Sequence, residues 1–431
     1  MRPNILLILS DDQPFYTMDY MSKALAHLSL GLEFTTSYVG SPLCSPSRAS
    51  IHTGLYPHNH GVKENKGAAK RFRSLRLQDI SLGALLQRQG YRCGYLGKVL
   101  NGYDETAAWE MPGYDEWTAV LTNRSPVRAN LNGRVKKTTT ARKNETSWLA
   151  TRARGFIEDA LEPWFCFASV KAPHSPYDPS DAHKNDFPDL TLPGRENFNH
   201  LDENKPKEVR ELSGLNESEQ STLQSIYRGK MRELMDLDDA IDSLCSVVDF
   251  ETTYVFFLTD NGFMLGEHRI HAKGVPYEEA TRTPLFVRGP GMRESATTDL
   301  LASAVDIAPT IAELAGLDPG PDGLDMDGRS LVGPMFEPAE DNLTWRDSLL
   351  LEMPSSKEFG KGWSAIRSSA SDSLYVEHDT GERELYDMQE DPYQLSNVAA
   401  EADSAVISEM SMKLHPMREA GGESLRAAEA S

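Results

Sequence analysis

Short apolar runs alternate with amphipathic helical patterns along most of this chain. The first run is Ile5 to Leu9, and later runs cover Tyr91 to Leu96, Trp164 to Val170, Tyr254 to Leu258 and Pro284 to Arg288. Unbroken apolar runs are typical of strands that are buried on both faces, and intervening helices favour parallel pairing. We therefore expect an α/β fold in which a mostly parallel sheet is sandwiched by helices.

Helical patterns fill the intervals between these runs. They predict helices over Ser81 to Gln89, Trp148 to Leu161 and Asp306 to Ala315. Between Leu223 and Leu244 the apolar residues recur with a clear 3.6-residue period, which predicts a long amphipathic helix. From Tyr177 to Glu219 the periodicity is weak, and we expect a long surface excursion there.

The chain divides at a segment rich in Gly, Pro and Asp, from Asp318 to Glu340. We expect residues 1–340 to form the α/β domain and residues 341–414 a small C-terminal α+β subdomain. Three short runs beyond the boundary predict an antiparallel sheet in that subdomain: Trp363 to Arg367, Leu374 to Glu377 and Glu384 to Tyr386. Residues 415–431 contain few hydrophobic side chains, and we expect a flexible tail.

The formal net charge of the 431 residues is -21. That charge repels phosphate backbones and anionic lipids, so we expect neither nucleic acid nor a membrane as a partner. The four cysteines lie far apart, which argues against a disulfide framework. The first apolar run is too short for a signal-peptide core and is followed at once by Asp11 and Asp12, so the sequence predicts a cytoplasmic protein.

Between Thr118 and Ser147 the charge reverses, because seven basic residues face a single acid, Glu145. Asn132-Gly133 indicates a hairpin turn within this stretch. The basic residues belong either to a solvated hairpin or to a rim that attracts anions despite the acidic whole. They are Arg124, Arg128, Arg134, Lys136, Lys137, Arg142 and Lys143.

Polar side chains follow four of the predicted strands, at the point where each strand ends. Because open α/β sheets bind ligands at the carboxyl ends of their strands, we expect these side chains to meet at one edge of the sheet. Their oxygen atoms are hard donors, which favours calcium, with magnesium as the alternative, over zinc. The side chains are those of Asp11 and Asp12, Lys98, His174, and Asp260 with Asn261.

A further helix is predicted after Cys44, because Pro46 suits a first helical turn and Gly54 a helix stop. Ser45 and Ser47 can cap its free N–H groups. Cys44 then lies at a helix N-terminus, where a thiol is activated and an anion is held. Arg48, one turn on, presents a planar fork of donors suited to an oxyanion. The alternative is that Cys44 is a small buried core residue.

Cys44-Ser45-Pro46-Ser47-Arg48, followed by Thr53-Gly54-Leu55-Tyr56-Pro57-His58-Asn59-His60-Gly61, resembles the signature of type I sulfatases. In that family the cysteine is oxidised to formylglycine by a formylglycine-generating or other maturing enzyme, and the hydrated aldehyde is the nucleophile. The resemblance implies an alkaline-phosphatase-like fold and a sulfuric ester hydrolase. It also implies a calcium ion held by Asp11, Asp12, Asp260, Asn261 and the modified side chain of Cys44.

The resemblance assigns roles to the other site residues. Gly97-Lys98 and Lys273 match the two lysines of the family, which would bridge nucleophile and sulfate and neutralise the sulfate oxygens. Arg48 would orient the aldehyde hydrate. His174, within Ala172-Pro173-His174-Ser175-Pro176, matches the histidine that protonates the leaving oxygen.

One position departs from the commoner family pattern. Many members carry a histidine two or three residues beyond the first lysine, where this chain has Leu100 and Asn101. Glucosamine-6-sulfatase-like members share this Gly-Lys-x-Leu-Asn run, so the resemblance points to a sulfated carbohydrate, with an aryl sulfate as the other candidate. Asn101, His268 and His271 are weaker candidates for substrate binding.

Two other functions stay open at this stage. The first is a phosphonate monoester hydrolase or phosphodiesterase of the same superfamily, since sulfate and phosphate esters are both tetrahedral. The second is an unmodified pseudoenzyme that binds sulfated glycans without cleaving them. The joint presence of metal-ligand, lysine and histidine candidates argues against this second function.

Overall fold

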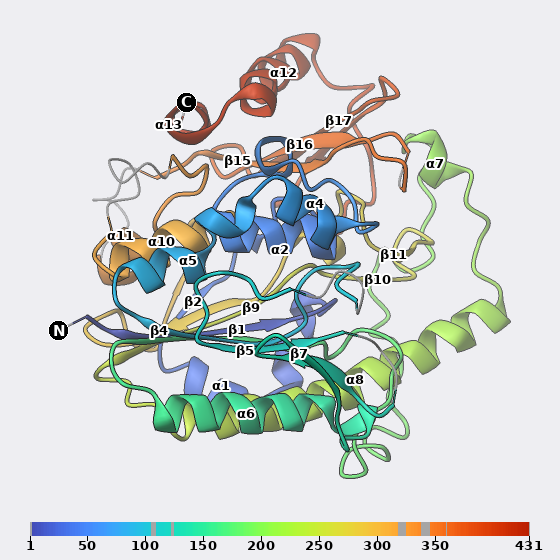
Figure 1. Cartoon of the computed structure of the whole chain (residues 1–431). Coiled ribbons are helices and arrows are strands. Elements are labelled where there is room, and N and C mark those ends of the chain that lie inside the picture. The colour runs from blue at the N-terminus through green and yellow to red at the C-terminus, as the bar shows by residue number, and fades with distance from the viewer. Residues whose placement is uncertain are drawn as a thin grey trace.

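A ten-stranded sheet runs through the computed structural model, which describes residues 2–104, 109–121, 125–317, 325–337, 345–358 and 360–430. Its strands are β1 (Asn4–Ser10), β2 (Leu32–Phe34), β4 (Arg92–Gly97), β5 (Glu116–Val120), β6 (Arg128–Leu131), β7 (Arg134–Lys137), β8 (Trp164–Ser169), β9 (Thr253–Thr259), β12 (Leu285–Arg288) and β13 (Ala296–Thr298). Their order across the sheet is β13-β2-β12-β9-β1-β8-β4-β5-β6-β7 (Figure 1).

The centre of this sheet is parallel and its margins are mixed. Strand β1 pairs in parallel with β8 and β9, and β4 pairs in parallel with β8 and β5. Strands β12 and β2 join antiparallel beyond β9, while β6 and β7 form an antiparallel hairpin at the other margin. The prediction of a mostly parallel sheet is confirmed.

Helices cover both faces of the sheet (Figure 1). One face carries α1 (Ser22–Leu28), α6 (Glu145–Asp159) and α8 (Glu217–Cys245). The opposite face carries α2 (Cys44–Thr53), α4 (Ala68–Ser74), α5 (Leu82–Arg88) and α10 (Ile307–Leu314). Every one of the helices that the sequence predicts is present, with ends that differ by a few residues.

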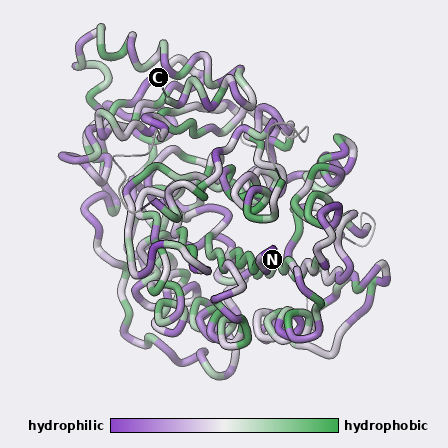
Figure 2. Tube along the Cα trace, turned by 90° about the vertical axis from the view of Figure 1, so that its left-hand side faces the viewer, coloured by the Kyte–Doolittle hydropathy of each residue, from purple (hydrophilic) through white to green (hydrophobic). Residues whose placement is uncertain are grey.

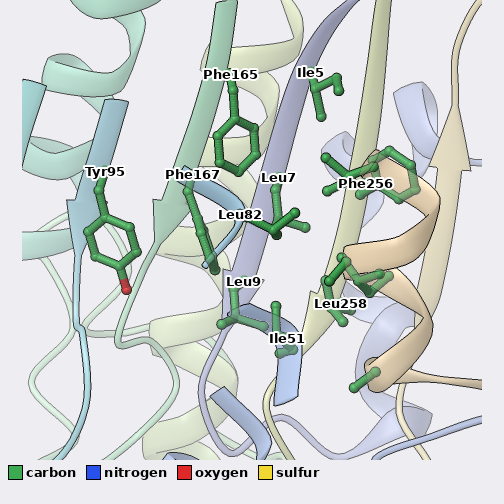
Figure 3. Packing of buried hydrophobic residues seen from close by; sticks show 14 of the residues in the cluster. Ile5, Leu7, Leu9, Ile51, Leu82, Tyr95, Phe165, Phe167, Phe256 and Leu258 are labelled. Atoms are coloured by element: carbon green, nitrogen blue, oxygen red, sulfur yellow. The ribbon is translucent and has the colours of Figure 1, made fainter. Parts of the chain in front are cut away.

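Strand β1 explains why the fold needs two layers of helices. Its alternate side chains point to opposite faces, because a strand has a period of two. Ile5, Leu7 and Leu9 are buried in the core beneath α2 and α5, where Figure 3 shows them beside Phe167 and Leu258. The intervening Leu6 and Ile8 belong to the second core, under α1, α6 and α8.

The C-terminal subdomain is a second sheet with the strand order β15-β16-β17-β18. Three of its antiparallel strands were predicted, and β15 was not. One face packs on the first domain through Leu351 and Val376, against Tyr38 and Tyr277. The strands are β15 (Ser348–Met353), β16 (Trp363–Ser368), β17 (Ser373–His378) and β18 (Arg383–Asp387).

The expectation of a flexible tail at residues 415–431 is wrong. Helix α12 (Ser404–Glu419) continues to residue 419, and α13 (Gly422–Glu429) follows it. Met417 and Leu425 are fully buried against the outer face of the small sheet. Few apolar residues suffice here because each falls on the inward side of its helix. The predicted domain boundary at residue 340 lies outside the described residues.

The remaining elements are short. They are β3 (Ser37–Tyr38), β10 (Met264–Leu265), β11 (His271–Ala272), β14 (Ala302–Ser303), α3 (Pro57–His60), α7 (Lys207–Arg210), α9 (Glu278–Thr281), α11 (Val332–Phe336) and the 3-10 helices η1 (Phe15–Tyr20), η2 (Leu77–Ile80), η3 (Arg142–Asn144) and η4 (Ala304–Asp306). Between residues 177 and 216, α7 is the one helix among the described residues, in agreement with the expected surface excursion.

Hydrophilic stretches lie mainly on the periphery of the molecule, as the hydropathy colouring in Figure 2 shows. In the part of the chain that the structure describes, no helix has both the length and the apolar character that a membrane span requires. All four cysteines are free and buried, so the prediction that no disulfide framework exists is confirmed.

Candidate active site

The polar residues that follow the central strands meet at one edge of the sheet, as predicted. Backbone hydrogen bonds continue the parallel ladders beyond the strands: Asp260 N donates to Ser10 O at 3.1 Å and Lys98 N to Ser169 O at 2.8 Å. Ligand atoms from Asp11, Asp12, Cys44 and His174 lie within 4.8 Å of one another. Four parallel strands that end together therefore create the site.

Gly97 allows the backbone to place Lys98 at this edge of the sheet. Its φ of 132° lies in a region that side chains rarely adopt, and a Cβ there would lie 1.7 Å from Ser169 O. The backbone therefore approaches β8 closely at this point. Lys98 follows with its Nζ on Asp11 Oδ2.

Cys44 is the first residue of α2 and is 1% exposed. Its Sγ lies 3.4 Å from Asp11 Oδ1, 3.9 Å from Asp12 Oδ1 and 2.7 Å from Lys273 Nζ. Burial and the Asp11 carboxylate raise the pKa of the thiol, although Lys273 opposes this. Burial therefore opposes the activation that we expect a helix N-terminus to give this thiol.

The start of α2 also differs from the predicted serine caps. Within the described part of the chain no side chain caps this helix, and Ser47 Oγ is buried there without a hydrogen-bond partner. Ser45 Oγ instead donates to Asn101 Oδ1 at 3.1 Å and accepts from the Asn101 backbone N–H at 2.9 Å. The hydroxyl of Ser45 thus joins the catalytic helix to the loop that carries Lys98. Gly54 ends the helix in a left-handed conformation, as predicted.

Asp11 and Asp12 are buried carboxylates held in the charged state. Burial opposes ionisation of Asp11, yet Lys98, His174 and Arg48 hold its pKa well below the usual range. Lys273, acting against burial, lowers the pKa of Asp12 to about 2. Asp12 also has a φ of 61°, a left-handed conformation that costs free energy and is typical of functional sites.

The oxygen atoms around these carboxylates fit a hard divalent cation. Asp260 Oδ1 accepts from Asp12 N at 3.2 Å, and Asn261 Nδ2 donates to Asp12 Oδ1 at 2.7 Å. Asn261 Oδ1 is buried and has no hydrogen-bond partner among the described residues. A buried amide oxygen without a donor, next to three carboxylates, is a donor set that suits calcium or magnesium.

The contacts of Arg48 differ from the prediction that its guanidinium group binds an oxyanion. Its side chain is 1% exposed, and Nε donates to Asp260 Oδ2 at 2.7 Å. The remaining hydrogen bonds go to Ser169 Oγ at 2.6 Å, Lys98 O at 2.9 Å and Asp11 Oδ2 at 3.3 Å. The guanidinium therefore fixes the carboxylates in place, and tertiary contacts decided this role.

Lys273 reaches the site from the short hairpin of β10 and β11. Its Nζ contacts both Asp12 Oδ1 and Cys44 Sγ. These acidic neighbours raise the pKa of Lys273 well above its ordinary value, despite the opposing effect of burial. Lys98 behaves in the same way beside Asp11. Both ammonium groups are therefore charged and lie where an anion would meet Cys44.

His174 is oriented by its own turn. Its Nδ1 lies 2.8 Å from Ser175 O, so Nδ1 carries the proton that this carbonyl accepts. The other ring nitrogen, Nε2, lies 3.6 Å from Asp12 Oδ2. Burial lowers the pKa of His174, and Asp11 and Asp12 oppose the shift. Nε2 is thus the nitrogen that exchanges protons within the site.

The three weaker substrate-binding candidates differ in their placement. Asn101 lines the same cavity as Lys98 and His174. His268 is 1% exposed, and its ring packs against that of Tyr277 with 4.5 Å between the ring centroids, so its binding role stays a prediction. His271 is exposed, with its ring edge on Phe263 at 5.5 Å, and its binding role stays a prediction.

Two buried lysines beside the site were not predicted from the sequence. Lys230 on α8 is 1% exposed, and its Nζ donates to Asp12 O at 2.9 Å, which supports the strained turn at Asp12. Lys171 follows β8 and lines the cavity that contains Lys98 and His174. The burial of Lys230 could have been predicted from its position on the apolar stripe of α8, between Tyr227 and Leu234.

The basic stretch between Thr118 and Ser147 forms the predicted hairpin, with Asn132 and Gly133 in left-handed conformations. Arg142 turns inward, 3.9 Å from an Asp178 oxygen and 4.0 Å from a Glu233 oxygen. Arg134, Lys136 and Lys137 are exposed on β7. Arg124 lies outside the described residues. The exposed cations leave both the solvated hairpin and the anion-attracting rim open.

Comparison with known proteins places this geometry in context. Residues 3–317 match a family model described as "Sulfatase", and residues 266–420 match one described as "N-sulphoglucosamine sulphohydrolase, C-terminal". The N-acetylglucosamine-6-sulfatase of Capra hircus is 30% identical, over 99% of this chain and 85% of its own length.

Two solved structures share the fold. One is a complex of a protein with its substrate D-glucosamine-2-N,6-O-disulfate; it has a TM-score of 0.79 and 21% identity, and the match covers 96% of each chain. The other is the phosphonate monoester hydrolase of Agrobacterium radiobacter, with a TM-score of 0.72 and 21% identity over 97% of this chain and 96% of that chain.

Proposed function

Because the chain belongs to the sulfatase family and is a sulfuric ester hydrolase, we propose that it cleaves a sulfate monoester of a carbohydrate with a formylglycine hydrate made from Cys44. The observation that carries this proposal is the place of Cys44 Sγ, 2.7 Å from Lys273 Nζ and 3.4 Å from Asp11 Oδ1. An atom at this position contacts both the ammonium group of Lys273, which can bind an anion, and the carboxylate of Asp11, which would bind the metal ion.

The conversion of Cys44 accounts for features that a cysteine nucleophile does not. The thiol is 1% exposed and its pKa is raised, so a thiolate is disfavoured at neutral pH. A geminal diol supplies an oxygen nucleophile in the same place. The maturing enzyme must then act before the chain folds, since the folded protein buries this side chain.

Asp11, Asp12, Asp260 and Asn261 would hold a calcium ion, with magnesium as the alternative. When bound, such an ion supplies positive charge to a sulfate oxygen and to the nucleophile. Arg48 keeps Asp11 and Asp260 in position through its buried hydrogen bonds. Asn261 Oδ1 has no hydrogen-bond partner among the described residues, which supports its role as a further ligand of the metal ion.

Lys98 and Lys273 neutralise the charge of the sulfate group as the bond to its bridging oxygen breaks. When both ring nitrogens are protonated, His174 donates the Nε2 proton to the departing sugar oxygen, while the Nδ1–H bond to Ser175 O keeps the ring in place. A sugar alkoxide is a poor leaving group, so this proton transfer is required for a carbohydrate substrate.

The carbohydrate substrate is supported by two observations. The Gly97-Lys98-Val99-Leu100-Asn101 run resembles that of glucosamine-6-sulfatase-like proteins, and the Capra hircus relative is named for that activity. We therefore propose a 6-sulfated glucosamine as the first substrate to test. A phosphonate monoester hydrolase is the second candidate, since a protein with that name shares the fold.

The first experiment is mass spectrometry of the peptide that contains Cys44, from protein made in a host that matures other sulfatases. Conversion to the aldehyde supports the nucleophile, and an unmodified thiol in that host contradicts it. Turnover of glucosamine 6-sulfate, an aryl sulfate and an aryl phosphonate by the same protein then ranks the substrates. Faster turnover of the phosphonate would favour the second candidate.

A further inference from the structure

A cavity of about 210 Å³ opens beside the reacting groups. Lys98, His174 and Asn101 line it on the side of the active site. Lys171 and Glu145 line it as well, together with the apolar residues Leu100 and Leu121. Since His174 faces the leaving oxygen in the proposed reaction, this cavity is where the sugar that bears the sulfate would lie.

Lys171 is a buried cation without a partner. Its side chain is 7% exposed, and Nζ has no hydrogen-bond partner among the described residues. Two other buried lysines are satisfied: Lys205 Nζ donates to Tyr386 Oη at 2.6 Å, and Lys230 Nζ donates to Asp12 O at 2.9 Å. A buried ammonium group without an acceptor is costly, and proteins keep one where a ligand supplies the acceptor.

The surroundings of Lys171 leave room for an anion. In the described ranges, Arg142 Nε is also buried without a hydrogen-bond partner, and Glu145 Oε2 accepts no hydrogen bond. Burial and Arg142 lower the pKa of Lys171 to about 8, and burial raises the pKa of Glu145. Because Lys171 Nζ has no hydrogen-bond partner among the described residues, the Glu145 carboxyl group does not hydrogen-bond to this ammonium group. A bound anion would restore the full charge of Lys171.

The backbone of Lys171 connects this position to the reaction. Its carbonyl accepts from the His174 backbone N–H at 2.8 Å, so both side chains project from the same turn after β8. A sugar whose sulfate oxygen is next to His174 therefore has its other ring substituents close to Lys171. Because His174 and Lys171 share this turn, the distance between them is fixed.

We propose that Lys171 forms an anion subsite for a second acidic group, a sulfate or a carboxylate, on the saccharide that carries the scissile sulfate. This subsite rests on the proposed sulfatase function for its place beside the leaving group. Glu145, from the first turn of α6, accepts a hydrogen bond from a hydroxyl on the same saccharide. The substrate class is thus a saccharide with at least two acidic groups.

The test compares Lys171→Met with the wild-type enzyme on three probes: glucosamine 6-sulfate, glucosamine N,6-disulfate, and glucosamine 6-sulfate linked to a uronic acid. We expect kcat/KM for a probe with the second acidic group to fall about 10- to 100-fold, mainly through KM. The monosulfate should change less than about twofold. If kcat/KM falls more for the disulfated probe, the second acidic group is a sulfate. If it falls more for the probe with a uronic acid, the second acidic group is a carboxylate.

Lys413→Met is the matched control, because Lys413 lies on α12 and pairs with Glu409 on the surface. It should leave all three probes unchanged. Lys171→Met removes no hydrogen bond from the free protein, so its melting temperature should match that of the wild type. Equal losses on all three probes, or no loss on any, would overturn the subsite.

A binding measurement separates this inference from the sulfatase proposal. Calorimetric titration of the three probes into protein with unconverted Cys44 reports affinity without turnover. If no probe is hydrolysed but Lys171→Met weakens binding of a doubly acidic probe, the subsite stands and the proposed reaction fails. If turnover is intact and Lys171→Met binds every probe as the wild type does, the subsite is wrong.

Discussion

Arg48 donates a hydrogen bond from Nε to Asp260 Oδ2 at 2.7 Å, and neither side chain is more than 1% exposed. The two residues come from α2 and from the end of β9, so the contact joins the helix that begins at Cys44 to the buried carboxylates at the edge of the sheet. Removal of Arg48 would leave the buried Asp260 carboxylate without its ion-pair partner. The geometry of the site therefore depends on this pair.

Replacing Arg48 by methionine should lower the free energy of unfolding by about 3–5 kcal/mol, because Asp260 keeps a buried charge without its partner. Turnover should fall by about 100-fold or more. Urea unfolding and kcat/KM measure the two effects. Arg152→Met, at a partly exposed pair with Glu116, is the control and should cost less than about 1 kcal/mol. Wild-type stability of Arg48→Met would contradict the assigned role.

His174→Gln should affect substrates according to their leaving group. With a sugar sulfate, loss of the general acid should lower kcat by about 10²- to 10⁴-fold. With nitrophenyl sulfate, whose leaving group needs no proton, the loss should stay below about tenfold. Steady-state kinetics on both substrates test this, with His415→Gln on the exposed side of α12 as the control. Equal losses on both substrates would argue against proton donation.

Removal of calcium should abolish turnover and lower the melting temperature. Calcium at about 100 times its Kd should add about 2.7 kcal/mol to the free energy of unfolding. Asn261→Leu should raise the calcium concentration needed for half-maximal recovery, since it removes one oxygen ligand. The surface variant Asp299→Asn should not. Full activity after exhaustive chelation would exclude the proposed cation.

Lys205 should make stability depend on pH. Burial lowers its folded pKa to about 8, against the ordinary 10.5, so between these values the unfolded chain binds more protons. The free energy of unfolding should therefore rise with pH from 8 to 10.5, by about 3 kcal/mol at most. Urea unfolding of wild type and Lys205→Met across this range should show a growing difference in favour of the wild type. Parallel pH profiles would contradict the prediction.

Leu425→Ala should destabilise the protein by about 2–5 kcal/mol, because Leu425 on α13 is fully buried in the subdomain core. Glu423→Ala on the exposed side of the same helix should change stability by less than about 0.5 kcal/mol. Thermal unfolding compares the two variants. Equal, negligible effects would restore the expectation of a flexible tail.

Much of the fold could be predicted from local patterns. Apolar runs identified the central strands, and the ends of parallel neighbours must lie at one edge. This reasoning alone brought Asp11, Asp12, Lys98 and His174 together. Strand β15 escaped prediction although Leu349, Leu350 and Leu351 are apolar and both of its faces are covered, because this apolar run is short and has polar residues on either side.

The roles of individual charges could not be predicted in the same way. Lys171 and Lys230 are ordinary lysines in the sequence, and only their burial makes them unusual. His268 lies close to Lys273 in the sequence, yet the chain turns it into the interface between the two sheets, beside Tyr277. Contacts between residues far apart in the chain decide such placements.

The sequence by itself determined the sheet, the start of α2 at Cys44 and the set of residues at the strand ends, because each follows from local periodicity and from residues that begin or end an element. The tertiary structure decided which charges face one another and which lose water. Desolvation depends on every element packed around a group, so the raised pKa of Cys44, the carboxylate contacts of Arg48 and the unpartnered Lys171 emerge only once the chain is folded.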